Sequence, residues 1–185
     1  LLWSAPDEYR PSEYCRAFFK LFYDADLKYS AAQLLMKKRI ELVRKYWPTF
    51  INDNDVIEEL NRTCDEFIIR VNHKTGQDLL LEEARYTKVL YKLAARAFKM
   101  SWVSRQHTGS LDEANSMLNH GNYLAYGVAN IGLYILGIPY SLSLIHGSTR
   151  RGALVFDVAD IFKDALILPM AFMAASEGSS EKEFR

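Results

Sequence analysis

One stretch constrains the fold more than any other. From Leu154 to Leu168 the chain reads as a helix that is apolar on nearly every side, yet it carries three aspartates. At about 100° per residue, Asp157, Asp160 and Asp164 fall within about 60° of one another and form one acidic stripe. A helix that is apolar all round is normally buried. Buried carboxylates without partners are strongly destabilising, so the stripe requires a cation, a proton or strong hydrogen-bond donors.

The overall composition is that of an ordinary globular protein. The chain has 185 residues, 49% of them apolar, which is enough for one domain or a small pair of domains. Lys and Arg number 23, as do Asp and Glu, so the net charge is zero and any basic surface must be local. Cys15 and Cys64 match no zinc or redox spacing, so we interpret them as reduced core thiols of a cytosolic protein.

The ends of the chain suggest a piece of a longer protein. It begins without Met, residues 1–11 read as a linker or domain entry, and residues 176–185 read as a frayed C-terminal tail. The uncharged stretch Tyr123–Ile145 is long enough for a transmembrane helix. Glycine, asparagine and proline interrupt it, so we expect a buried helix followed by a turn and no membrane span.

Helical periodicity accounts for nearly everything between these ends. We therefore predict an all-α fold class, a single domain of six or seven helices over residues 12–175, with at most a short strand before His146. Besides the acidic helix, we expect five helices. The first begins at Ser12, the second runs from about Ser30 to Trp47 and ends before Pro48, and the third runs from a cap at Asn52–Asp55 to a turn at His73–Gly76. The fourth runs from Asp78 to Met100 and the fifth from Asn122 to Gly137, with a polar loop at Trp102–Asn115 between them.

The helix from Asp78 to Met100 separates two neighbouring acids. On a helical wheel Glu83 lies at the centre of the apolar face, whereas Glu82 points about 100° away and is expected to be a rim charge. Glu83 therefore needs a partner, which is either a metal ion or a structural salt bridge. Basic residues form a stripe on the opposite side. The preceding basic run, from Lys37 to Lys45, is either a solvated face or a phosphate-contacting surface.

The histidine before the acidic helix completes a candidate metal site. His146, Glu83 and the aspartates offer the ligands of a hard or borderline divalent ion, and one imidazole favours Mn²⁺ without excluding Mg²⁺. Asn122 and Tyr126 share a helix face, where the tyrosine is either a core hydrogen-bond partner or a catalytic group. An anionic substrate, with phosphate the natural candidate, is indicated by Thr149, Arg150 and Arg151, although the arginines also fit a turn cap or surface ion pairs.

Three blocks in combination resemble a known family. LLLEEARYTKVLYKLAA, EANSMLNHGNYLAYG and HGSTRRGALVFDVADIFKDALILPMAF are similar to the helical catalytic domain of the CRISPR-associated integrase-nuclease that captures new spacers, in its type I-F form. The similarity runs from about Leu79 to Phe172. It implies that the family's amino-terminal β-rich domain is absent from this chain, and that the protein is bacterial and cytoplasmic.

The resemblance also implies site residues and a reaction. The divalent ligands would be Glu83, His146 and Asp160, with Asp157 as ligand or supporting partner and Tyr126 nearby; Lys163 and Asp164 would support the site. The implied reaction is metal-dependent attack of a captured fragment's 3′ hydroxyl on a phosphodiester of the CRISPR repeat, with nicking of branched DNA as its hydrolytic counterpart. The implied partners are DNA, a second copy of the chain, and the small dimeric adaptation protein, which is fused to a helicase-nuclease in type I-F systems.

Two other functions remain open at this point. The first is a non-catalytic helical interaction module, in which the polar core is only structural and the basic stripes bind protein or nucleic acid. A metal phosphohydrolase acting on small phosphate esters uses the same residue types.

Overall fold

The computed structural model describes residues 12–108, 112–146 and 152–179, and over these ranges it holds helices and turns but no strand. The predicted all-α fold is therefore confirmed, and the described residues before His146 form no strand, which agrees with the prediction of at most a short one there. In chain order the elements are α1 (Ser12–Tyr23), α2 (Ala25–Phe50), α3 (Asn54–Val71), α4 (Gly76–Ala97), α5 (Glu113–Ile135), α6 (Ala153–Phe162), the π-helical turn η2 (Lys163–Ile167) and α7 (Leu168–Ser176).

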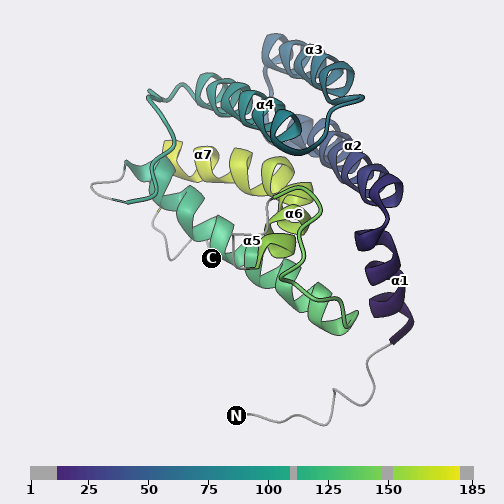
Figure 1. Cartoon of the computed structure of the whole chain (residues 1–185). Helices are drawn as coiled ribbons and strands as arrows, with labels where there is room; N and C mark the ends of the chain where they lie inside the picture. The colour runs from purple at the N-terminus through teal and green to yellow at the C-terminus, as the bar shows by residue number, and fades with distance from the viewer. Residues whose placement is uncertain (1–11, 109–111, 147–151, 180–185) are drawn as a thin grey trace, which may run out of the picture.

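The acidic helix runs through the middle of the molecule. α6, η2 and α7 follow one another without a break and pack against α2 on one side and α5 on the other (Figure 1). Ala159, Ala165 and Phe172 along this run are fully buried, because helices cover it on both sides. The burial predicted from its apolar composition is confirmed, and all three aspartates are buried with it.

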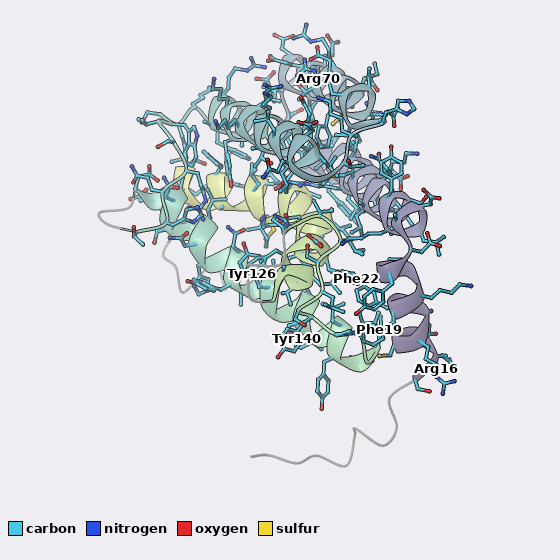
Figure 2. The ribbon with its side chains drawn as sticks, viewed as in Figure 1. Arg16, Phe19, Phe22, Arg70, Tyr126 and Tyr140 are labelled. Atoms are coloured by element: carbon cyan, nitrogen blue, oxygen red, sulfur yellow. The ribbon has the colours of Figure 1, made fainter. Side chains whose placement is uncertain are left out.

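Two hydrophobic clusters flank this central helix. The larger one joins α2, α3, α4 and α7, with Trp47, Leu90 and Phe172 among its fully buried members. The smaller one joins α1, α5 and α6 through Phe18, Ala129 and other residues. Tyr126, which packs against the smaller cluster, lies near the middle of the view, whereas Arg16 of α1 and Arg70 of α3 lie toward its edges (Figure 2).

Helix α2 is longer than predicted at both ends. It starts at Ala25, where the Asp24 carboxylate accepts hydrogen bonds from two backbone amides, and it continues through Pro48 to Phe50. The prediction that Pro48 ends the helix was wrong. Trp47 is fully buried and its indole N–H donates to the Asp164 carbonyl at 2.8 Å, and the Ile51 amide closes the helix on the Trp47 carbonyl. These contacts thus outweigh the loss of the one backbone hydrogen bond that Pro48, which has no N–H, cannot donate in the last turn.

Helix α5 also begins earlier than predicted, at Glu113 instead of Asn122. Its cap is Asp112, whose carboxylate accepts from the Asn115 amide at 2.7 Å. Arg105 of the preceding loop donates to the side chains of Asn115 and Asn119, which ties that loop to the helix. In the part of the chain that the structure describes, no helix is long and apolar enough to span a bilayer.

The two cysteines have different surroundings. Cys64 is fully buried in the larger cluster beside the Tyr86 hydroxyl, whereas Cys15 on α1 is only half-buried, and neither is in a disulfide. The prediction of a core thiol was therefore right for Cys64 and wrong for Cys15, because α1 packs against the molecule through Phe18 and leaves most of its other residues exposed.

Candidate metal centre

Three side chains from separate parts of the fold meet beside the central helix. Glu83 comes from the second turn of α4, His146 from the end of the turn region that precedes α6, and Asp160 from α6. One ligand atom from each side chain lies within 4.8 Å of the other two. These are the three residues that the sequence indicated as metal ligands.

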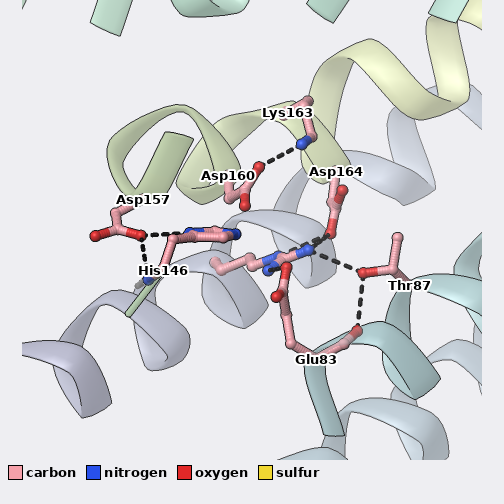
Figure 3. Close-up of polar contacts among 8 residues, drawn as sticks. Glu83, Thr87, His146, Asp157, Asp160, Lys163 and Asp164 are labelled. Carbon is pink, nitrogen blue, oxygen red and sulfur yellow. Dashed lines mark hydrogen bonds and ion pairs between the residues drawn. The ribbon is translucent and has the colours of Figure 1, made fainter. Parts of the chain in front are cut away.

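Asp157 holds His146 in place (Figure 3). The His146 Nδ1 lies 2.6 Å from Asp157 Oδ1, and the His146 backbone amide donates to the same oxygen. The other oxygen accepts from the Ser143 hydroxyl at 2.9 Å and from two backbone amides, those of Leu144 and Ile145. Both Asp157 oxygens are thus engaged as acceptors, and Nδ1 bonded in this way leaves His146 Nε2 for a ligand. The hydrogen bond from Asp157 raises the pKa of His146.

Asp160 is paired with a lysine of the same helical run. Lys163 lies one turn on and donates to Asp160 Oδ1, and its ammonium sits 5.7 Å from the centre of the Tyr126 ring. Burial alone would raise the pKa of Asp160, but the attraction of Lys163 and Arg39 outweighs burial and lowers that pKa. Asp160 therefore presents a carboxylate in its charged form.

Glu83 and Asp164 share one arginine. The Arg39 guanidinium from α2 donates through Nη1 to Glu83 Oε1 at 2.7 Å and through Nε to Asp164 Oδ2 at 2.7 Å. Its Nη2 donates to the Thr87 hydroxyl at 3.0 Å, and that hydroxyl donates to the Glu83 carbonyl at 2.9 Å. In Figure 3 the dashed lines from Glu83, Thr87 and Asp164 converge on this side chain.

A cavity of about 540 Å³ opens over the three candidate ligands. Basic and aromatic groups line the rest of it, and they come from α4, from the loop after α4, from α5, from α6 and from η2. Such a lining suits a ligand that has both negative charge and flat rings. Besides Glu83, His146 and Asp160, the lining includes Lys88, Tyr91, Lys92, Trp102, Arg105, His107, Asn122, Tyr126, Phe156 and Lys163.

The two glutamates of α4 are placed differently from the prediction. Glu82 is only 2% exposed and accepts from Lys74 and Arg85, so its assignment as a rim charge was wrong. Glu83 is half-buried at the edge of the buried face and lines the cavity. The face that packs inward is centred on Tyr86, Leu90 and Leu93, because the stacked pair Tyr86–Phe67 draws α4 toward α3.

The other predicted residues fall into two groups. Asn122 and Tyr126 line the cavity from one face of α5, and the Tyr126 ring meets the Phe156 ring edge-on at 4.6 Å. Thr149, Arg150 and Arg151 lie outside the described residues.

Arg39 is the main site residue that sequence reasoning missed. The sequence predicts it within a basic run that is either a solvated face or a phosphate-contacting surface. Lys37, Lys38 and Lys45 of that run are exposed, whereas Arg39 is buried and fits neither interpretation. The signal was present: Met36, Ile40 and Val43 are buried, and Arg39 lies on the face that they define. The buried position of one arginine in a basic run is recognised only when the run is compared with the apolar positions on either side of it.

The three candidate ligands fit a divalent ion such as Mn²⁺ or Mg²⁺. Two oxygens that both bind one such ion at about 2.1 Å lie at most about 4.2 Å apart. Since the candidate atoms lie within 4.8 Å, small side-chain rotations suffice. Two carboxylates and one imidazole are also the donor types that these ions accept.

The amino-acid sequence of this chain is similar to those of one protein family. The sequence model described as CRISPR associated protein Cas1 matches residues 3–185. The chain is 41% identical to the CRISPR-associated endonuclease Cas1 of Pectobacterium atrosepticum and 40% identical to that of Pseudomonas aeruginosa. Each alignment covers 99% of this chain and 59% of the relative, so the chain spans about three fifths of their length.

A solved structure shows the same fold. It is described as the crystal structure of a TtCas1–DNA complex and superposes with a TM-score of 0.67 at 19% identity, covering 96% of this chain and 56% of that one. At this identity the likeness speaks for the helical architecture only.

Proposed function

Because the chain belongs to the Cas1 family of CRISPR-associated proteins, we propose that residues 12–175 form the metal-dependent catalytic domain of a DNA endonuclease and integrase. Residues 1–11 are the linker into this domain and residues 176–185 its tail. The observation that carries the proposal is the meeting of Glu83, His146 and Asp160 at one side of a cavity whose remaining lining is rich in lysine, arginine and aromatic rings.

The substrate in this proposal is DNA, bound by its phosphates. Lys88, Lys92 and Arg105 line the same cavity as the candidate ligands, and their charges suit the backbone of a strand whose reacting phosphate lies at those ligands. Trp102 and Tyr126 provide ring faces for an unstacked base. The predicted phosphate-binding residues Thr149, Arg150 and Arg151 follow His146 directly in the sequence and belong to the same proposal.

The reaction is transesterification at phosphorus. A 3′ hydroxyl attacks the phosphodiester, a new P–O bond forms, the old bond to the neighbouring 3′ oxygen breaks, and that oxygen takes up a proton as the attacking hydroxyl loses one. With water as nucleophile the same step nicks the strand. A bound Mn²⁺ or Mg²⁺ would polarise the phosphoryl oxygen and stabilise the transition-state charge.

The chain's own side chains orient this chemistry. Glu83, His146 and Asp160 would hold the ion, with Asp157 fixing the His146 ring through Nδ1 so that Nε2 is left for the ion. Lys163, which lines the cavity beside Asp160, balances negative charge on the phosphate, and Tyr126 bounds the space next to it. Asp164 holds Arg39 behind the site.

Family membership alone supports the remaining parts of the proposal. These are a homodimer, the small dimeric adaptation protein that is fused to a helicase-nuclease in type I-F systems, and a cytoplasmic location in bacteria. They concern a whole protein of which this chain spans about three fifths.

Metal binding tests the site directly. Isothermal titration of Mn²⁺ into the purified chain should show one binding event, which Asp160→Asn and His146→Ala weaken or abolish. Equal Mn²⁺ binding by the wild type and both variants would contradict the catalytic proposal and favour a non-catalytic helical interaction module.

Substrate choice separates the proposal from a small-molecule phosphatase. The longer protein with Mn²⁺ should nick branched DNA and leave a panel of nucleotides intact, and Asp160→Asn should abolish the nicking. Hydrolysis of nucleotides without any action on DNA would overturn the DNA assignment.

A further inference from the structure

Arg39 is buried more deeply than its charge would suggest. It lies midway along α2, is only 2% exposed, and packs on the face that carries Met36, Ile40 and Val43. A buried guanidinium is strongly unfavourable unless carboxylates and other acceptors satisfy its donors. Helix α2 contributes none of the candidate metal ligands, so the partners of Arg39 tell what it does there.

Its five N–H donors are distributed over the acid cluster in a definite pattern. Nε and Nη2 both reach the Asp164 carboxylate, at 2.7 and 2.5 Å, while Nη1 reaches Glu83 at 2.7 Å. The Thr87 hydroxyl closes a ring, since it accepts from Nη2 and donates to the Glu83 carbonyl one helical turn back. One rigid planar group therefore fixes both the carboxylate and the backbone carbonyl of a candidate ligand residue.

Arg39 does not contact the space where a substrate would lie. Among the described residues that line the cavity of about 540 Å³, Glu83 and Asp160 are present and Arg39 is not. Together with His146, Asp157 and Asp160, Arg39 lines a separate void of about 10 Å³. Arg39 can therefore act on the chemistry only through the residues that it holds and through the field of its charge at Asp160.

The charges of the cluster favour this role. Four carboxylates gather here, from Glu83 and the three aspartates, against the permanent cations Arg39 and Lys163, which leaves two negative charges when His146 is neutral. That balance matches one divalent ion. Burial raises the pKa of Asp164 against the opposing attraction of Arg39, so the charge of this carboxylate depends on the guanidinium.

We propose that Arg39 is a positioning residue of the metal centre, which orients the Glu83 carboxylate toward a divalent ion and holds Asp164 as its own counter-charge. The inference rests on the proposed function, because it takes Glu83 as a ligand. Arg39 keeps Glu83 in a ligating orientation before the ion arrives, and so lowers the ordering that binding would otherwise require.

Arg39→Lys is the sharpest test, because it keeps the positive charge and removes the planar fork. Mn²⁺ affinity, measured on the full 185-residue chain by electron paramagnetic resonance, should fall by about tenfold to a hundredfold. Arg44→Lys is the matched control: it makes the same change on the same helix, where Arg44 pairs with the exposed Asp65, and it should leave Mn²⁺ affinity unchanged. Circular dichroism verifies that each variant is folded.

A double-mutant cycle distinguishes positioning from mere structural support. If Arg39 acts through Glu83, Arg39→Lys in a Glu83→Gln background should weaken Mn²⁺ binding much less than it does in the wild type. Equal weakening in both backgrounds would assign Arg39 to general stability and overturn the inference.

If Arg39→Lys does not fold, a less disruptive variant, Thr87→Val, tests the same inference. Thr87→Val removes only the hydroxyl that Arg39 and the Glu83 carbonyl share, and should reduce Mn²⁺ affinity by a few fold. Wild-type affinity in both Arg39→Lys and Thr87→Val would overturn the inference and leave the metal site standing. Absence of Mn²⁺ binding in the wild type would instead overturn the proposed function.

Discussion

The two sides of the candidate metal centre are built in contrasting ways. On one side, His146 and Asp157 lie 11 residues apart, and the turn between Ser143 and His146 wraps its backbone amides around the Asp157 carboxylate. On the other side, Arg39 and Asp164 are 125 residues apart, and side chains of α2 make the links: Arg39 reaches the Glu83 and Asp164 carboxylates, and Trp47 reaches the Asp164 carbonyl. We call these the local side and the distant side.

The contrast is one of redundancy. Asp157 accepts from three backbone amides, one hydroxyl and one imidazole, and no substitution other than to proline removes one of the amides. On the distant side, Glu83 and Asp164 both depend on one guanidinium. The local side should therefore tolerate changes in its partners, whereas the distant side should fail when Arg39 is changed.

The largest effect is expected from Arg39→Met, which removes the cation of the distant side. Asp164 is 1% exposed and would lose the Arg39 guanidinium that donates to its carboxylate. The free energy of unfolding, measured by urea denaturation, should therefore fall by about 3–5 kcal/mol. The double variant Arg39→Met with Asp164→Leu should recover much of the loss, because both buried charges are gone. A loss below about 1 kcal/mol, as for a surface pair, would contradict the dependence on Arg39.

A smaller loss is expected from Asp157→Asn on the local side. The amide keeps one acceptor oxygen but turns an N–H₂ toward groups that also donate, so the free energy of unfolding should fall by about 1–3 kcal/mol. Asp65→Asn, which changes an exposed partner of Arg44, is the control and should cost less than about 1 kcal/mol. If Asp157→Asn proved more damaging than Arg39→Met, the ranking of the two sides would be reversed.

Part of the Asp157 effect should depend on pH. The pKa of His146 is raised in the folded chain by the hydrogen bond to Asp157, so the pair stabilises the metal-free fold fully below the unfolded pKa of about 6.5 and loses this contribution as pH rises through the folded pKa. With EDTA present, the gap in unfolding free energy between wild type and Asp157→Asn should be wider at about pH 5.5 than at about pH 8.5. A gap that widens with pH would show that His146 is not charged by this contact.

The smallest effect is expected from Ser143→Ala. It removes one of five donors to Asp157 and leaves the backbone amides in place, so the loss in unfolding free energy should be about 1 kcal/mol or less. Ser141→Ala, at an exposed position two residues earlier, should be neutral. A loss as large as that of Asp157→Asn would mean that the amides do not supply the expected redundancy.

The same contrast explains how far the sequence could lead. The burial of the acidic helix followed from its own residues. The contact of Asp157 with His146 did not, because the resemblance left Asp157 open as either a ligand or a supporting partner. Only part of the distant side could be predicted from the sequence. Glu83 was selected, but Glu82 was misplaced because a wheel of α4 alone does not show that Tyr86 stacks on Phe67 of α3.

Arg39 shows the physical limit of such reasoning. Its neighbours Lys37 and Lys38 are solvated, and the type of the residue gives no hint of which face it occupies. Its role is set by Asp164 and Glu83, which reach it from other helices. A pairing between side chains that are far apart along the chain is decided by packing, and helical periodicity predicts which face is buried but not what lies opposite.

The π-helical turn η2 has a geometric consequence for the whole central rod. The Leu168 amide bonds back to the Lys163 carbonyl, five residues earlier, so this turn accommodates one residue more than a regular turn would. The surplus residue shifts the phase of everything after it by about 100°. On a regular helix Asp160 and Phe172 would point about 120° apart, and the shift brings them to about 20° of one another. One side of the rod therefore carries both the Asp160 carboxylate at the cavity and the Phe172 ring in the larger core. Deleting a single residue here would rotate α7 out of step with its neighbours, even though every remaining side chain was unchanged.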